Sequence, residues 1–497
     1  MRDLYLAIDV GTGGLRSALV DKEGGILAIC HKEHDQIVPQ FGWSEQRPAD
    51  WWVGCIETMR DVLQQVDDAV NRVAAICACG QMHGSVLIDD DGQLTREAAL
   101  LWNDKRTLDQ VAAFERQFKL EQYLDITANS AAPAWPAFKL KWIAENDPEA
   151  LERASSLLMP KDYINFKLTG LRAQDWTEAS MSFLMDCTTR QWSKKMLNFF
   201  NLKTSLLPDI HDPLSVLGPL QERAAQRVGL PSGIPVLVGA GDYPVALLGS
   251  GVISPGMGSD VTGTSSIITM IHDRPTIHPE VSNVATVSDA WGSLTLLDAG
   301  GDAVRWARRA FHEDRRSYSE ISDAATRSCA GSNKLFFLPY LSGERFGEHR
   351  NSRAQFFGLS AEHSLADLHR AVLEGVAFSV RQQLESLQGG AGRPDRIVAA
   401  SGGAKSQLWL QIKASMYNTP YLVPEELECG VVGAAIMMAD AIGDIDGIES
   451  GAKRMVRYGE EIRPNPEWVD TYNAMVPIYQ QLYVASQPLY DALDALA

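Results

Sequence analysis

Apolar residues in the first thirty positions form short runs separated by glycine-rich breaks, a pattern typical of strands joined by tight turns. The predicted strands are LYLAID, LRSALVD and ILAIC (residues 4–9, 15–21 and 26–30), with GTGG and KEGG as the turns. A helix is expected from Pro48 to Val66, because apolar residues recur there at helical spacing and proline suits a first helical turn. VAAICAC (73–79) predicts a further buried strand. Alternating strands and helices indicate an α/β fold with a mixed or parallel sheet.

Strands and helices are predicted to alternate along the rest of the chain as well. SVLIDDDG (85–92) predicts a strand that ends in an acidic turn, and residues 104–118 and 137–146 are expected to be helical. In the second half, KLFFLPYLSGER (334–345) is a predicted strand that runs into a polar loop, and residues 364–387 form a long amphipathic helix with Ser364 as its N-cap. DRIVAAS (395–401) predicts a strand, and helices are expected over 407–418, over 430–443 and beyond Pro464.

A weak internal repeat suggests two related domains. SDVTGTSSIITMI, near residue 260, has the layout of AIDVGTGGLRSALV near the N-terminus: a strand, a turn containing Gly-Thr, and a second strand. A chance match of two glycine turns is the alternative. A chain of 497 residues is long for a single core, so we expect two domains, residues 1–248 and 249–497, that meet at a central cleft.

Charge and composition narrow the class of partner. The formal net charge of −18 argues against nucleic acid, which would require a basic surface patch. No apolar run is long enough to span a membrane, and Asp3 and Asp9 interrupt the N-terminal stretch that a signal peptide would need. The seven cysteines are scattered and form no C-x-x-C pair, so we expect neither a disulfide framework nor a zinc site. Cys77 and Cys79 should share one buried face, and the expected location is the cytoplasm.

Three glycine-rich turns are candidates for binding phosphate: Gly11–Gly14, Gly263–Ser266 and Gly402–Ser406. Glycine lets backbone N–H groups approach phosphate oxygens, and the hydroxyls of Thr12 and Thr264 can donate to them. The third turn precedes a helix, whose N-terminus adds partial positive charge. Neither G-x-x-x-x-G-K-[ST] nor a G-x-G-x-x-G after a strand occurs, so P-loop and dinucleotide-binding classes are not supported. The alternative is that each turn only reverses the chain.

Two aspartates and a Met-His pair stand where strands end, a common location of ligands in α/β proteins. Asp9 precedes GTGG, and a carboxylate beside bound phosphate implies an intervening cation such as Mg²⁺. Asp242, in GAGDYP, could accept a proton from an alcohol that attacks phosphorus. GQMHG (80–84) places Met82 and His83 directly after VAAICAC. Taken singly, each aspartate is better explained as a residue that caps a turn, and the histidine as one that only bonds to a nearby carbonyl.

Together these segments resemble the FGGY family of carbohydrate kinases, a branch of the actin-like ATPases, over almost the full chain. AWPAFKLKWIAEN (134–146) is similar to the first family signature, and AQFFGLSAEHSLADLHRAVLEG (354–375) to the second. FGWSEQRPADWW, GQMHG, LLWNDKRT, MPKDYINFKLTG and FLPYLSGER resemble the xylulokinase branch. The resemblance implies two actin-like (ribonuclease H-like) domains, the first on the sugar side and the second on the nucleotide side.

The resemblance also implies roles for single residues. Asp242 falls where the family keeps its catalytic base, and Met82, His83, Tyr243, Trp43 and Asn103 fall on the sugar side. Asp9 and Asp242 are the implied Mg²⁺ ligands. The implied ATP-binding residues are Asp9, Thr12, Gly13, Arg16, Gly263, Thr264, Gly301, Arg305, Gly402, Gly403 and Gln407.

The expected activity is transfer of phosphate from ATP to a ketopentose, D-xylulose first, at O5. Tyr243 stands where xylulokinases usually carry Asn, so a kinase for D-ribulose, L-xylulose or a tetritol is the first alternative. A non-catalytic actin-like ATPase scaffold is the second. Ala134 replaces a substrate-binding Tyr of glycerol kinases, which argues against glycerol. Relatives are often dimers, but no segment of the sequence identifies a homodimer interface.

Overall fold

The computed structural model describes residues 2–344, 350–387 and 393–496 and divides into two compact units. The first unit comprises residues 1–253, 273–292 and 428–456, and the second comprises 254–272, 293–427 and 457–497. The sequence predicted that the chain passes from the first domain to the second only once, after residue 248. In the structure the chain passes between the two units more often, because residues 273–292 and 428–456 belong to the first unit. Arg345, which ends the FLPYLSGER segment, lies outside the described residues.

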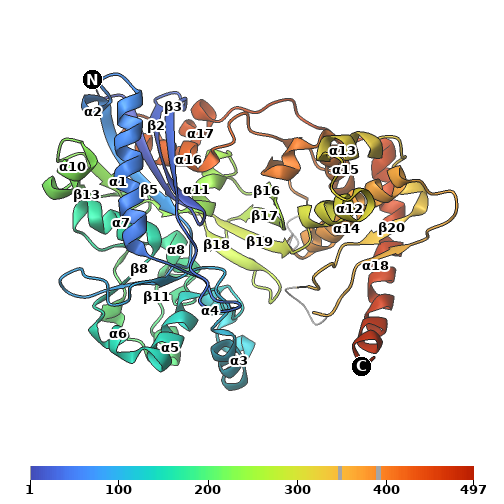
Figure 1. The fold of residues 1–497 in the computed structure, drawn as a ribbon, viewed down its shortest axis with the longest axis horizontal. Coiled ribbons are helices and arrows are strands. Elements are labelled where there is room, and N and C mark those ends of the chain that lie inside the picture. Colours follow the sequence, from blue (N-terminus) through green and yellow to red (C-terminus); the bar gives the residue numbers. More distant parts are fainter. Residues whose placement is uncertain (1, 345–349, 388–392, 497) are drawn as a thin grey trace. The chain divides into compact units, whose positions relative to one another are not determined.

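A mixed sheet forms the centre of the first unit (Figure 1). Its order is β13 (Val216–Pro219), β14 (Pro235–Leu237), β5 (Val73–Gly80), β1 (Leu4–Val10), β2 (Gly14–Asp21) and β3 (Ile26–Glu33), and β15 (Ala240–Gly241) also pairs with β5. β1 pairs antiparallel with β2 and parallel with β5, and β15 is parallel to β5 as well. The three predicted N-terminal strands and VAAICAC are therefore confirmed.

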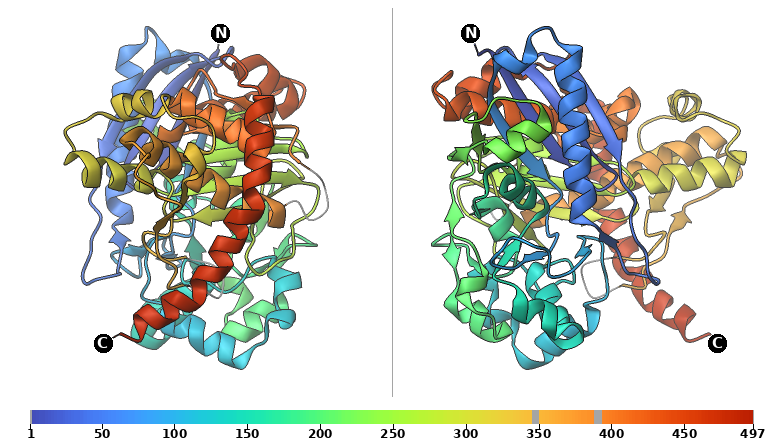
Figure 2. Two further views of the ribbon diagram at one scale, coloured as in Figure 1. Left: turned by 90° about the vertical axis from the view of Figure 1, so that its right-hand side faces the viewer. Right: turned by 60° about the vertical axis from the view of Figure 1, so that its left-hand side comes forward.

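Helices cover both faces of this sheet. One face packs on α1 (Pro48–Gln65), α7 (Pro160–Thr169) and α10 (Glu222–Val228), and the other on α11 (Asp242–Gly249), α16 (Cys429–Ala441) and α17 (Ile448–Met455). Side chains of β1 alternate between the two faces, as those of a fully buried strand must. Cys77 and Cys79 lie together on the face covered by α11 and α16, as predicted. α1, blue in Figure 2, begins and ends within one residue of the prediction.

Shorter elements complete the first unit. The helices are α2 (Ala69–Arg72), α3 (Leu108–Gln117), α4 (Leu124–Thr127), α5 (Pro136–Asn146), α6 (Pro148–Arg153), α8 (Trp176–Ser180) and α9 (Lys194–Phe200). The strands are β4 (Glu45–Gln46), β6 (Val86–Ile88), β7 (Ala99–Leu100), β8 (Ser156–Leu158), β9 (Gln174–Asp175), β10 (Met185–Asp186), β11 (Gln191–Trp192), β12 (Ile210–His211) and β18 (Ser282–Ala285). α3 starts at Leu108 rather than at residue 104, because the Asp104 carboxylate accepts hydrogen bonds from the backbone of Ser44 and Arg106 and holds this segment as a loop.

The second unit has a sheet of related layout. β19 (Trp291–Leu297), β17 (Ser266–His272), β16 (Met257–Thr262), β22 (Arg396–Ala400) and β23 (Tyr421–Leu422) follow one another in that order. β16 pairs antiparallel with β17 and parallel with β22, as β1 does with β2 and β5. This shared pairing supports the predicted repeat. β20 (Phe336–Leu338) pairs with β21 (Gln355–Phe357).

The helices of this unit are α12 (Gly301–His312), α13 (Tyr318–Ala325), α14 (Leu365–Leu387), α15 (Gln407–Tyr417) and α18 (Pro466–Asp494). α18, the long red helix of Figure 2, confirms the predicted helical tail. The predicted fold class, mixed α/β with two units, is confirmed. Among the described residues, no helix is both long and apolar enough to cross a membrane.

Candidate active site

Three predicted site segments of the first unit follow neighbouring strands at one edge of its sheet. In the parallel pairing of β1 with β5, Asp9 lies opposite Cys79 and Val10 opposite Gly80. In the pairing of β15 with β5, Gly241 lies opposite Gly80. Asp9, the Met82–His83 pair and Asp242 therefore come together where three adjacent strands end, which is where open α/β sheets bind ligands.

Asp9 lies opposite Arg16 across the β1–β2 hairpin. The Arg16 Nε atom is 3.1 Å from Asp9 Oδ2, and Arg16 Nη1 is 2.5 Å from Glu428 Oε2. Burial raises the pKa of Asp9, while Arg16 acts against this rise and Glu428 adds to it. Asp9 Oδ1 is buried and has no hydrogen-bond partner among the residues that the structure describes. The site thus holds one carboxylate oxygen that is available to a ligand.

Asp242 is the first residue of α11, directly after β15. Its Oδ1 atom accepts a 2.7 Å hydrogen bond from the backbone N–H of Tyr243. Burial raises the pKa of Asp242 to about 7 and the Asp9 charge adds to the rise, while the Tyr243 hydrogen bond and Arg16 oppose it. A carboxylate with this pKa suits a general base that works near neutral pH.

Met82 and His83 follow β5 in the turn that the sequence singled out. The Met82 side chain packs against Gly241, where a Cβ atom would lie only 2.8 Å from Met82 Sδ. Met82 therefore borders the residue that precedes Asp242. His83 has a positive φ of 66°, which is uncommon for a residue other than glycine, and its ring packs against Trp135 with centroids 5.2 Å apart. Burial and nearby Lys139 lower the pKa of His83 to about 3, so the ring is neutral.

Thr12 and Gly13 occupy the β1–β2 turn. The Thr12 hydroxyl donates to Gln81 Oε1 at 3.1 Å and accepts from Trp102 Nε1 at 3.0 Å. Gln46 Nε2 donates to the Thr12 carbonyl at 2.7 Å. These hydrogen bonds hold the β1–β2 turn against the rest of the first unit, while Gly13 is exposed.

Trp43 lies against the buried Arg106, and Asn103 precedes Arg106 closely in the sequence. The Arg106 guanidinium is 3.7 Å from the centre of the Trp43 ring and pairs with Asp104. Trp43 also meets Trp142 edge-on at 5.4 Å, so its ring has a packing role whether or not it touches a sugar. Asn103 Oδ1 is buried and has no hydrogen-bond partner in the described part of the chain, so it can accept a hydrogen bond from a ligand.

The predicted nucleotide residues of the second unit form a separate cluster. The N–H of Gly301, at the start of α12, donates to the Gly263 carbonyl at 2.9 Å, and Asp302 N–H donates to the Thr264 carbonyl at 2.9 Å. A Cβ atom on Gly301 would lie 2.2 Å from Gly263 O, so only glycine fits. Gly403 is equally constrained by Thr262, with 2.7 Å from a Cβ to the Thr262 Cβ.

The remaining residues of this cluster are exposed. Gly402 begins a 3-10 turn, Gln407 begins α15, and both are exposed, as is Thr264. Arg305 Nε donates to Asp302 Oδ1 at 2.8 Å within α12. The β16–β17 turn, the start of α12 and the Gly402–Lys405 turn thus meet at one place in this unit.

Sequence reasoning missed three residues of the first unit that contact the site. Glu428 binds Arg16 from 412 positions away, and no local pattern indicates such a contact. Thr177 accepts the N–H of Gly241. Lys139 was noted only as part of a family signature, and its Nζ atom donates to the His83 carbonyl. Its apolar surroundings, AFKL, were the available signal that it is buried.

Comparison with known proteins agrees with this fold. Residues 4–249 match the N-terminal domain and residues 259–442 the C-terminal domain of the FGGY family of carbohydrate kinases, so the chain belongs to this family. It is a phosphotransferase that acts on a carbohydrate, in a family that uses ATP, rather than a non-catalytic scaffold.

Within the family, the chain is similar to proteins named xylulose kinase. It is 28% identical to the xylulose kinase of Bacillus subtilis over 495 residues, which covers 99% of this chain and 98% of that protein. The crystal structure of xylulose kinase from Rhodospirillum rubrum superposes with a TM-score of 0.92 at 26% identity, covering 98% of this chain and 99% of that one. A gluconate kinase from Lactobacillus acidophilus also superposes with a TM-score of 0.92 at 26% identity, covering 99% of this chain and all (100%) of that one.

Proposed function

We propose that the chain phosphorylates a ketopentose, D-xylulose first, at O5, with ATP and Mg²⁺. The observation that carries the proposal is the register of β1, β5 and β15, which brings Asp9, Met82–His83 and Asp242 to one edge of the sheet. The proposed sugar contacts and the proposed base thus lie there together with Asp9, whose Oδ1 atom has no hydrogen-bond partner among the described residues. The xylulose kinases among the relatives support the choice of sugar.

Asp242 would act as the general base. As the O5 hydroxyl attacks the γ-phosphorus of ATP, Asp242 takes its proton, an O–P bond forms, and the bond from γ-phosphorus to the β,γ-bridging oxygen breaks. The products are the sugar 5-phosphate and ADP. General-base help of this kind contributes roughly 10²–10⁴ in rate. The pKa of about 7 keeps a large share of Asp242 ionised at neutral pH.

Met82 and His83 would hold the sugar beside this base. The Met82 side chain offers an apolar surface next to Gly241, and His83, which is neutral, offers a ring nitrogen as hydrogen-bond acceptor. Asn103 Oδ1 would accept from a further hydroxyl. Trp43 and Tyr243 are the remaining predicted sugar contacts. Tyr243 follows Asp242 directly, so it is the residue that we expect to tune the choice of sugar.

The residues fit a magnesium ion. Asp9 Oδ1 is buried and has no hydrogen-bond partner among the described residues. The negative charge of Asp9 raises the pKa of Asp242, and a cation between the two carboxylates would counteract that effect. Mg²⁺ is commonly bound through one or two carboxylates together with substrate phosphates, which suits Asp9 and Asp242. When bound, it would neutralise charge on the transferred phosphoryl group.

ATP would bind through the glycine turns. In the second unit, Gly263, Thr264, Gly301, Gly402 and Gly403 would receive the phosphates, near the start of α12. Arg305 and Gln407 would lie toward the adenosine. In the first unit, Thr12, Gly13 and Arg16 would face the γ-phosphate. Location in the cytoplasm and a homodimer stay predictions.

The test is ADP release, measured with ATP and Mg²⁺ across D-xylulose, D-ribulose, L-xylulose, tetritols, gluconate and glycerol. A kcat/KM for D-xylulose at least about tenfold above the others supports the proposal. A preference for another sugar would support the kinase activity but overturn the choice of D-xylulose as the substrate. The second candidate, a kinase for a different ketose or polyol, is favoured by Tyr243 in place of the usual Asn.

A further inference from the structure

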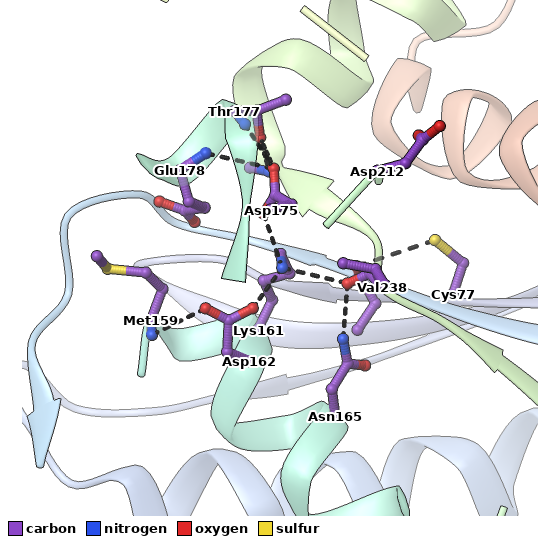
Figure 3. A network of polar contacts seen from close by, with 12 residues as sticks. Cys77, Met159, Lys161, Asp162, Asn165, Asp175, Thr177, Glu178, Asp212 and Val238 are labelled. Carbon is purple, nitrogen blue, oxygen red and sulfur yellow. Dashed lines mark hydrogen bonds and ion pairs between the residues drawn. The ribbon is translucent and has the colours of Figure 1, made fainter. Parts of the chain in front are cut away.

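A short segment, Val238–Gly241, leads from β14 to Asp242, and buried side chains hold it at both ends; Figure 3 shows the Val238 end. The Val238 carbonyl accepts from Lys161 Nζ at 3.1 Å and from Asn165 Nδ2 at 2.7 Å. At the other end, the Gly241 N–H donates to Thr177 Oγ1 at 3.0 Å. The segment that precedes Asp242 is therefore held by side chains at both of its ends.

The Thr177 hydroxyl is itself held in one orientation. It donates its only proton to Asp175 Oδ1, so a lone pair is left for the Gly241 N–H. Asp175 also accepts the backbone N–H groups of Thr177 at 2.7 Å and Glu178 at 3.3 Å, and so caps α8. Its second oxygen pairs with Lys161 Nζ at 2.8 Å.

This network is closed to solvent. Lys161, Asp175 and Thr177 are each fully buried, at 0% exposure. The result is a continuous hydrogen-bonded path from Lys161 through Asp175 and Thr177 to Gly241. In a buried path of this kind each bond strengthens its neighbours, and a missing partner leaves a buried polar group unpaired.

The segment between the two anchors has little freedom to adjust. Gly239 has a φ of 70°, and a Cβ there would lie 2.0 Å from the Ala78 carbonyl oxygen. Ala240 and Gly241 pair with Cys79 and Gly80 of β5. A shift of Gly241 would therefore pass directly to Asp242, the next residue.

We propose that Thr177 is a positioning residue that fixes Asp242 through the Gly241 N–H, with Asp175 and Lys161 orienting its hydroxyl. This rests on the proposed role of Asp242 as the base. A displacement of a reacting group by about 1 Å can cost on the order of a hundredfold in rate. The loss should appear mainly in kcat, because Met82 and His83, the proposed sugar contacts, belong to the turn after β5 and not to the Val238–Gly241 segment.

The experiment compares Thr177→Val with Thr177→Ser and with a control, Thr127→Val. The valine variant keeps the shape and removes the hydroxyl, and serine restores it. Thr127 is matched because it is also buried and its Oγ1 also accepts a backbone N–H, from Asn129 at 3.2 Å. We expect kcat to fall about ten- to a hundredfold in Thr177→Val, with sugar affinity within about threefold, recovery in Thr177→Ser, and no comparable loss in Thr127→Val.

A double-mutant cycle with Asp242→Asn separates positioning from general damage. If Thr177 acts through Asp242, Thr177→Val should cost almost nothing more once the base is gone. Three results would overturn the proposal. The first is a full additional loss of kcat when Thr177→Val is added to Asp242→Asn. The others are a folded Thr177→Val enzyme with wild-type kcat, and a loss of kcat in Thr127→Val as large as that in Thr177→Val. If the valine variant does not fold, Thr177→Ala against Thr177→Ser makes the same comparison.

Failure of the base assignment gives a different result. If Asp242→Asn itself keeps wild-type turnover, the proposed function of Asp242 is wrong whatever Thr177 does. If Asp242→Asn loses turnover and Thr177→Val does not, only the positioning role is wrong.

Discussion

Lys139 Nζ donates a 2.6 Å hydrogen bond to the backbone carbonyl of His83. His83 holds a φ of 66°, a backbone conformation that costs a non-glycine residue free energy. Its Nδ1 atom lies 3.2 Å from the Met181 carbonyl, which can only accept, so Nδ1 carries the proton. The other ring nitrogen, Nε2, is then unprotonated and is the atom that we propose accepts a hydrogen bond from a sugar hydroxyl.

Replacing Lys139 should therefore weaken sugar binding more than turnover. We expect Lys139→Met to raise the sugar KM about tenfold, with a smaller change in kcat, because the His83 backbone loses the bond that helps to hold its strained conformation. Steady-state kinetics check this. Lys141→Met, on the exposed side of the same helix, is the control, and equal effects of the two variants would contradict the account.

The pH dependence of kcat/KM for MgATP, which reports the enzyme before Mg²⁺ binds, should show an acid limb with an apparent pKa near 7. Asp242 must be ionised to accept the proton, and its pKa is raised to about 7, so activity should rise as pH increases through this value. His83, with a pKa of about 3, does not titrate in this range. The pKa of Lys139 is lowered to about 7, but its neutral amine can still donate to His83. An acid limb near pH 4 would contradict the assignment.

The same raised pKa predicts a pH-dependent gain in stability for Asp242→Asn. The folded protein holds the Asp242 proton more tightly than the unfolded chain, so the contribution to stability is complete below the ordinary value of 3.8 and is lost as pH rises to about 7. Asn avoids that loss. At pH 8 the variant should be more stable by on the order of 1–3 kcal/mol, after discounting for partial exposure.

Urea unfolding at pH 8 and pH 4 measures this difference, which should shrink toward the lower pH. Asp289→Asn is the control, since the Asp289 side chain is fully exposed. An Asp242→Asn variant less stable than the wild type at pH 8 would mean that the charged carboxylate is stabilised by contacts within the protein.

Removal of divalent cation should abolish sugar-dependent ADP release. We expect excess EDTA to stop the reaction, Mg²⁺ to restore it, and Asp9→Asn to raise the free Mg²⁺ needed for half-maximal rate about tenfold. The matched variant is Glu428→Gln, which removes the other carboxylate partner of Arg16 and leaves Asp9 in place. Equal shifts in the two variants would indicate that Asp9 acts only by orienting Arg16.

Much of the fold could be predicted because local patterns determine it. The β1–β2 hairpin, β5 and α1 follow from apolar periodicity and turn residues, and the shared face of Cys77 and Cys79 follows from strand alternation. The start of α3 could not be predicted, because the side chain of Asp104 bonds to Ser44, sixty residues away. The interleaved units depend on contacts of the same long-range kind.

The repeat shows how similar sequences can take different roles. Asp9 and Asp260 occupy similar places in the two hairpins, yet Asp260 is fully buried and bonded to Lys413 Nζ and Tyr421 Oη, each at 2.8 Å. Asp9 keeps an unpaired oxygen. Only the packing of distant helices distinguishes the two, just as it brings Glu428 to Arg16 and Thr177 to Gly241.

The central claim is that Asp242 is the base in phosphoryl transfer to a sugar. The most direct test measures D-xylulose-dependent ADP release and, by calorimetry, D-xylulose binding for the wild type and for Asp242→Asn. The account predicts a fall in kcat of about 10²–10⁴ with sugar affinity kept within about threefold. Turnover at the wild-type rate in a variant that binds the sugar normally would contradict it.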